Sequence, residues 1–134
     1  MKQECLQVSR NKLIVFQENR IKLTVINKDK HEITKVKIDG CEITKGIRCD
    51  YLLLSNNLEY FIELKGQDIN HAIKQLGASI EQLNLNPDIK IGFIICQRSN
   101  KGAASIMNAT KKFKKKYGFN LIIQSSQFKY KLGK

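Results

Sequence analysis

The feature that most constrains the fold is the alternation of strand and helix patterns in the second half of the chain. The run IKIGFIIC (89–96) is almost continuously apolar, which is typical of a central strand covered on both faces. Helical spacing of apolar residues spans 68 to 84, and a second helix is expected over about residues 102 to 117. With LEYFIELKG (58–66) before them and NLIIQ (120–124) after them, the order predicts parallel strands in an α/β fold.

The first half predicts antiparallel strands. KLIVF (12–16) and IKLTVI (21–26) are rich in β-branched and aromatic residues, and ITKVKI (33–38) alternates apolar with polar residues. Asp39-Gly40 is a hairpin signal, because glycine accepts a positive φ. RCDYLLLS (48–55) is expected to be the next strand.

The turn Ser55-Asn56-Asn57 should join the strand 48–55 to the strand 58–66 as a hairpin. The tail FKYKLGK (128–134) is expected to be frayed. We therefore expect one domain, residues 1–134, with a single central mixed β-sheet flanked by helices.

The net charge points to a polyanionic partner. The 134 residues carry 24 Lys and Arg against 12 Asp and Glu, a formal charge of +12. Such an excess attracts nucleic acid and speeds encounter with it. An acidic membrane is the competing partner, but we find no amphipathic helix with an aromatic anchor face. Without an apolar segment typical of a signal peptide or a membrane span, we expect a cytoplasmic location and no membrane partner.

The cysteines show no recognisable metal or redox spacing. There is no C-x-x-C pair, and the two histidines are not spaced to complete a zinc site. For an intracellular chain we expect all four to be reduced and buried: Cys5, Cys41, Cys49 and Cys96.

A carboxylate and an ammonium share one side of the apolar strand 58–66. Glu63 and Lys65 stand two positions apart, so in a strand they project to the same side. Asp50 and Glu63 are symmetric about the turn at 56 and 57, which brings them opposite each other. Paired carboxylates bind hard divalent cations, and a neighbouring lysine can position a water and balance charge on phosphorus. A simple Glu63–Lys65 salt bridge is the structural alternative.

These residues resemble the signature of the PD-(D/E)XK nuclease superfamily, which includes many restriction endonucleases and archaeal Holliday-junction resolvases. Asp50, then Glu63-Leu64-Lys65, then a helix follow the family order over residues 33–96, with Cys49 in place of the proline. The resemblance implies a restriction-endonuclease-like core and hydrolysis of nucleic-acid phosphodiester bonds. It implies Mg²⁺ (or Mn²⁺) held by Asp50 and Glu63, with Lys65 as the catalytic lysine.

Two further elements of the family pattern are incomplete. Many members carry an upstream glutamate on a helix, which this chain lacks before the first core strand; the candidates are Glu42, Glu18 and Glu4. Gln75 matches the position of a glutamine that faces the site in some members, although the tyrosine that often follows it is Ser79 here. Gln75 as an exposed polar helix residue is the alternative interpretation.

Lysines crowd the end of the second expected helix. The predicted phosphate contacts are Lys111, Lys112, Lys114 and Lys115, with Arg98 and Lys101 in the loop after the strand 89–96. Some of the helix lysines also complement the helix dipole.

Three functions are therefore in view. We expect a metal-dependent nuclease, most simply a DNA endonuclease. A homodimer fits this function, because one small domain cuts one DNA strand at a time. The alternatives are a non-catalytic nucleic-acid-binding module with the nuclease fold, and a subunit whose basic face meets an acidic protein. DNA and RNA are not distinguished.

Overall fold

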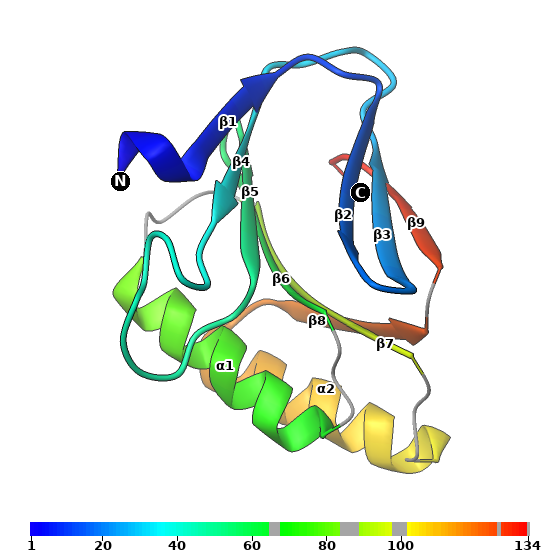
Figure 1. Cartoon of the computed structure of the whole chain (residues 1–134). Coiled ribbons are helices and arrows are strands. Elements are labelled where there is room, and N and C mark those ends of the chain that lie inside the picture. Colours follow the sequence, from blue (N-terminus) through cyan, green and yellow to red (C-terminus); the bar gives the residue numbers. More distant parts are fainter. Residues whose placement is uncertain (65–67, 84–88, 98–101, 126, 134) are drawn as a thin grey trace.

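The described part of the chain is an α/β fold with two β-sheets and two α-helices (Figure 1). The computed structural model describes residues 1–64, 68–83, 89–97, 102–125 and 127–133. Neither described α-helix is both long enough and apolar enough to cross a membrane. The elements are η1 (Gln3–Cys5), β1 (Leu6–Ser9), β2 (Leu13–Glu18), β3 (Ile21–Ile26), β4 (Ile33–Lys37), β5 (Tyr51–Ser55), β6 (Leu58–Leu64), α1 (Ile69–Gln82), β7 (Ile89–Cys96), α2 (Ala103–Tyr117), β8 (Asn120–Ser125) and β9 (Phe128–Lys131).

The larger sheet has the strand order β1-β4-β5-β6-β7-β8. Its first four strands pair antiparallel, and β7 and β8 add in parallel to β6. The expected parallel half and the expected β5–β6 hairpin are both confirmed. The change from antiparallel to parallel pairing falls on β6, whose residues are all buried.

The expectation of a single sheet is wrong. The hairpin β2–β3 forms a separate three-stranded sheet with β9, in the order β2-β3-β9. The expectation of a frayed tail is wrong for the same reason: β9 pairs in parallel with β3 from Leu23↔Phe128 to Ile26↔Lys131. Tyr130 of β9 makes edge-on contacts with the rings of Tyr60 and Phe93, with 5.9 and 5.0 Å between centroids. The side of β9 that carries Tyr130 therefore packs on the larger sheet.

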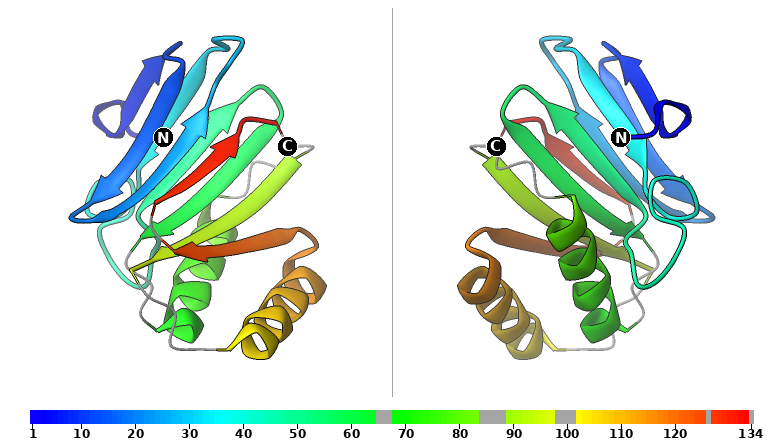
Figure 2. Two further views of the ribbon diagram at one scale, coloured as in Figure 1. Left: turned by 90° about the vertical axis from the view of Figure 1, so that its right-hand side faces the viewer. Right: turned by 90° about the vertical axis from the view of Figure 1, so that its left-hand side faces the viewer.

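The larger sheet is the middle of three layers (Figures 1 and 2). One core lies between the two sheets and includes Phe16, Leu23 and Phe93. The other lies between the larger sheet and the helices and includes Phe61 and Phe113. These two cores explain why β6 and β7 are almost continuously apolar, as the sequence indicates.

Glycines allow both helices to pack closely. A Cβ at Gly92 of β7 would lie 3.3 Å from side-chain atoms of Phe113 and Leu121 and 3.4 Å from Leu76, so the bare backbone gives the helices room. Helix α2 ends at Gly118, which has φ +81°. At the start of α1, Asp68 is the N-cap and accepts a hydrogen bond from the His71 N–H at 3.1 Å.

The segment between β4 and β5 differs from its prediction. Gly40 does adopt a positive φ of +76°, but the chain makes only an isolated bridge between Asp39 and Ile43 before a longer excursion. The regular strand starts at Tyr51 rather than at residue 48. The N–H groups of Ile38 and Asp39 both donate to the Asp50 carbonyl, at 3.0 and 3.3 Å, so this loop folds back on the start of β5.

The expectation that all four cysteines are reduced is also wrong. Cys5 and Cys41 form a disulfide, with their Cα atoms 5.7 Å apart. The antiparallel pairing of β1 with β4 brings these residues together, because Cys5 precedes β1 and Cys41 follows β4. Cys49 and Cys96 are free and buried, as expected. Burial raises the pKa of Cys49 to about 12, which keeps its thiol protonated.

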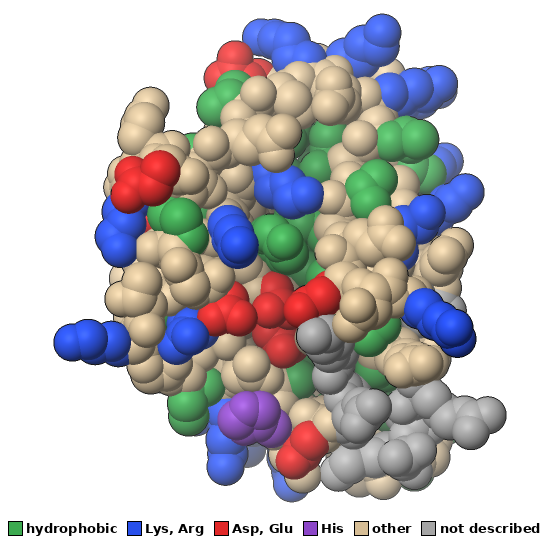
Figure 3. All heavy atoms as spheres, viewed as in Figure 1, with side chains coloured by type: hydrophobic (Ala, Val, Ile, Leu, Met, Phe, Trp, Pro, Cys, Tyr) green, Lys and Arg blue, Asp and Glu red, His purple; other side chains and the backbone are tan. Residues whose placement is uncertain are grey.

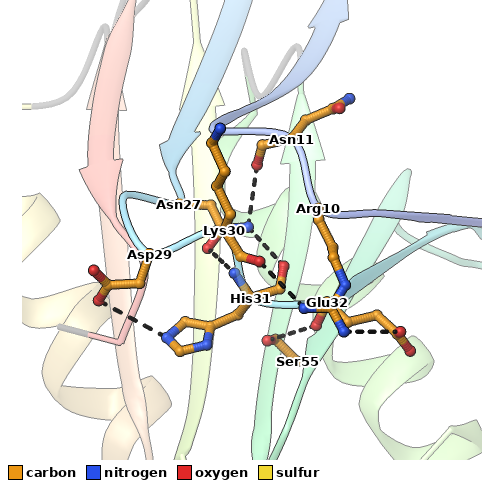
Figure 4. A network of polar contacts seen from close by, with 8 residues as sticks. All are labelled: Arg10, Asn11, Asn27, Asp29, Lys30, His31, Glu32 and Ser55. Carbon is orange, nitrogen blue, oxygen red and sulfur yellow. Dashed lines mark hydrogen bonds and ion pairs between the residues drawn. The ribbon is translucent and has the colours of Figure 1, made fainter.

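A polar network joins the ends of several strands (Figure 4). The buried Asn27 donates to the carbonyls of Asn11 and His31 and accepts from the His31 N–H. Ser55 at the end of β5 donates to the Glu32 carbonyl at 3.1 Å. The two sheets are thereby connected through the β1–β2 and β3–β4 loops.

Candidate functional site

Asp50 and Glu63 are neighbours at the end of the β5–β6 hairpin, as the sequence predicts. The register runs from Ser55↔Leu58 to Tyr51↔Ile62, and the Asp50 N–H continues it by donating to the Ile62 carbonyl at 3.1 Å. Asp50 also accepts a hydrogen bond from the Leu64 N–H, with 2.8 Å between Oδ2 and N. The Asp50 carboxylate is therefore held against the end of β6, next to Glu63.

Burial makes this pair electrostatically unusual. Desolvation first and the negative charge of Asp50 second raise the pKa of Glu63 to about 9. Desolvation also raises the pKa of Asp50 to about 6, against the stabilising Leu64 N–H. Two carboxylates so close cannot both ionise cheaply, so the pair retains a proton at neutral pH when no cation is bound.

Two more acidic residues contribute to the field at the pair. The charges of Glu18, the last residue of β2, and of Asp39 both raise the pKa of Asp50. Figure 3 shows Asp and Glu side chains gathered at the centre of one face, with Lys and Arg side chains around them. Asp39 also forms an ion pair with Arg48, with 2.6 Å between Oδ1 and Nε.

The three upstream glutamates are therefore not equivalent. Glu18 is the candidate whose charge acts on Asp50. Glu42 instead accepts a hydrogen bond from the Lys2 backbone N–H at 2.8 Å, beside the disulfide. Glu4 lies in η1 and is exposed.

Helix α1 holds the chain just before Asp50. Ser79 is fully buried, and its Oγ accepts the Cys49 N–H at 2.8 Å. Gln75, one turn earlier, donates from Nε2 to the Arg48 carbonyl at 3.1 Å. Gln75 is thus half-buried and bound to backbone, not the exposed polar residue of the alternative interpretation. Ser79 was missed from the sequence, although its spacing of four from Gln75 puts both on one helix face.

The donor set of the pair fits a hard divalent cation. Glu63 Oε1 is buried and has no hydrogen-bond partner among the residues that the structure describes. An orphaned carboxylate oxygen beside a second carboxylate is the chemistry that Mg²⁺ and Mn²⁺ prefer. Within the described ranges, no group of three or more His, Cys, Asp or Glu residues is arranged to hold a metal ion, so the protein would contribute the two carboxylates.

Three predicted site residues fall outside the described residues: Lys65, Arg98 and Lys101. The expected same-side placement of Glu63 and Lys65 on one strand therefore stays a prediction. The salt-bridge alternative for this pair is likewise untested.

The predicted basic helix is present, but its lysines do not form one face. All are exposed on α2; Lys112 lines a groove against α1, whereas Lys111 and Lys114 line a hollow beside β8. Because α2 ends just before β8 begins, this end of the helix lies at the opposite end of the parallel strands from Glu63. A strand of seven residues is roughly 20 Å long, so these lysines would contact a substrate well away from the carboxylates.

Comparisons with known proteins do not assign the site. A scan of protein-family models, a search of curated proteins and a search of solved structures each gave no significant match to this chain.

Proposed function

We propose that this protein is a metal-dependent nuclease that hydrolyses phosphodiester bonds in nucleic acid, with DNA as the first substrate to test. The observation that carries the proposal is the pairing of the half-buried Asp50 with the buried Glu63, whose Oε1 has no hydrogen-bond partner among the described residues and whose pKa is raised. Such a pair beside an apolar strand lowers the folding stability unless a bound ligand offsets the loss, which makes it a candidate functional site.

In this proposal Asp50 and Glu63 hold the cation. When bound, a divalent ion would neutralise charge on the scissile phosphate and lower the pKa of a water molecule. Ser79 and Gln75 hold residues 48 and 49, and through them they orient Asp50. Lys65, predicted to follow Glu63 on the same side of the strand, would position the attacking water or balance charge.

The fold supports the family resemblance without establishing it. The order β4-β5-β6-α1-β7 is an antiparallel meander, a helix and a strand parallel to β6, which is the order of the restriction-endonuclease-like core without its first helix. The upstream acid would be Glu18 from a strand of the small sheet, where many members of the family use a helix. A cytoplasmic location and a homodimer stay predictions from the sequence, and the Cys5–Cys41 disulfide is more typical of oxidising compartments.

The test is cleavage of plasmid, branched DNA and RNA with Mg²⁺, with Mn²⁺ or with chelator. Asp50→Asn and Glu63→Gln should each abolish cleavage because each removes a ligand, whereas Glu81→Gln, at an exposed position of α1, should not. Lys65→Ala should stop cleavage yet leave metal binding intact. Metal-dependent cleavage that persists in both carboxylate variants would sink the proposal.

The same preparation separates the alternatives. Salt-dependent binding to nucleic acid without cleavage in any metal would favour the non-catalytic binding module. Absence of binding at low salt would favour a subunit that meets an acidic protein. Joint replacement of Lys111, Lys112, Lys114 and Lys115 by Gln should flatten the salt dependence of binding equally for all sequences.

A further inference from the structure

A groove between the two helices is separate from the carboxylate pair. It has a volume of about 580 Å³, within the range of small-ligand sites. Residues of α1 and α2 line it: Asn70, Ile73, Lys74, Ser105, Asn108, Ala109, Lys112, Phe113, Lys116 and Tyr117. Both helices pack on the face of the larger sheet away from the small sheet (Figures 1 and 2).

The rim of the groove is cationic. Three lysines line it, Lys74 from α1 and Lys112 and Lys116 from α2, and no Asp or Glu is among the lining residues that the structure describes. All three lysines are exposed. Two asparagines and one serine add hydrogen-bonding groups, so the rim matches a ligand with several anionic oxygens along its length.

The floor of the groove is apolar but offers little exposed apolar area. Phe113 is only 2% exposed, and Ile73 and Tyr117 are half-buried. Tyr117 closes the far end against α1, where Gly77 allows it: a Cβ there would lie 2.1 Å from the Tyr117 Oη. A partner helix would need deep apolar pockets for its anchoring side chains. A base or a sugar needs only a flat apolar surface.

The groove is oriented toward the carboxylates. Helices α1 and α2 each connect two parallel strands, so both start at the end of the sheet where Glu63 lies. Asn70 and Ser105, in the first turns, line that end of the groove, and Lys116 lines the other. The helix N-termini add positive partial charge on the side of the site.

We propose that the α1–α2 groove binds a short segment of single-stranded nucleic acid. Phosphates contact Lys74, Lys112 and Lys116, and a base or sugar lies on Ile73 and Tyr117. A volume of about 580 Å³ is that of a small-ligand site, which suits part of a single strand better than a duplex. The inference rests on the proposed function for the class of ligand, nucleic acid. It adds that the nucleic-acid strand that leaves the carboxylate pair follows this groove.

The experiment measures binding, not cleavage. A labelled homothymidine strand of about 12 nucleotides is titrated with protein in chelator, and the affinity is followed against salt. Lys74→Gln with Lys116→Gln should weaken binding roughly tenfold or more. It should also make the slope of log affinity against log salt about 1.4 less steep, because each phosphate contact on a single strand contributes about 0.7.

Two controls separate the groove from general charge. Lys12→Gln with Lys28→Gln removes the same charge from exposed positions on the small-sheet side and should change binding little. Ala109→Leu fills the groove without changing charge and should weaken binding, whereas Ala104→Leu, exposed on α2 outside the groove, should not. Circular dichroism checks that each variant folds.

Several results would overturn the proposal: equal weakening by the two lysine pairs, wild-type binding by Ala109→Leu, or a duplex bound as tightly as the strand and equally sensitive to the groove variants. The readout is independent of the nuclease proposal. Cleavage by a protein whose single-strand binding is insensitive to the groove variants would refute only the groove proposal. Binding in the groove without cleavage in any metal would refute only the nuclease proposal.

Discussion

The protonated carboxylate pair predicts an unusual pH dependence of folding stability. Glu63 is 5% exposed, and its pKa is raised from 4.5 to about 9, first by burial and then by Asp50. In the unfolded chain this carboxyl group is ionised above about pH 5, so the folded protein holds one more proton than the unfolded protein up to about pH 9. The stability that depends on this proton is present below pH 4.5 and is lost as pH rises toward 9.

The magnitude follows from proton linkage. Each pH unit within this window lowers the free energy of unfolding by about 1.4 kcal/mol. Asp50, with a pKa raised to about 6, adds its own loss only at lower pH. Between about pH 6.5 and 8.5 the wild-type protein should therefore lose up to about 3 kcal/mol through Glu63. Glu63→Gln cannot ionise, so it should lose little over the same range.

Urea unfolding at several pH values in chelator measures this slope. Glu81→Gln, which replaces an exposed carboxylate, is the control and should keep the wild-type slope. Saturating Mg²⁺ should flatten the slope of the wild-type protein, because a bound cation favours the ionised pair, and it should have little effect on Glu63→Gln. Equal slopes for wild-type and Glu63→Gln protein would refute the claim that Glu63 stays protonated.

Three further substitutions test the surrounding structure. Ser79→Ala should lower the free energy of unfolding by about 1–3 kcal/mol, since the buried Cys49 N–H loses its acceptor; an unchanged urea midpoint would contradict that role. Cys5→Ser with Cys41→Ser should cost about 3–4 kcal/mol, and a reductant should destabilise the wild-type protein alone by the same amount. Tyr130→Ala should cost about 2 kcal/mol, less than a fully buried ring, if β9 packs as described; a thermal unfolding midpoint equal to that of the wild-type protein would instead indicate a frayed tail.

The sequence by itself determined the parts of this protein that depend on local information. The apolar run of β7 has the predicted bounds, residues 89–96, because a strand covered on both faces contains few polar residues. The approach of Asp50 to Glu63 was predictable because a tight turn at residues 56 and 57 sets the register of the whole hairpin. The two expected helices, over 68 to 84 and about 102 to 117, likewise lie close to their observed bounds, Ile69–Gln82 and Ala103–Tyr117.

Tertiary structure alone decided what depends on segments distant in the chain. The tail Phe128–Lys131 alternates apolar and lysine residues and becomes a strand only because β3 offers a free edge and Tyr60 and Phe93 a surface for Tyr130. The Cys5–Cys41 disulfide required the pairing of β1 with β4, which no local signal encodes. The charge of Glu18 acts on Asp50 because the small sheet packs on the large one. Contacts of this kind depend on the packing of complete layers, and a linear pattern does not specify which layers meet.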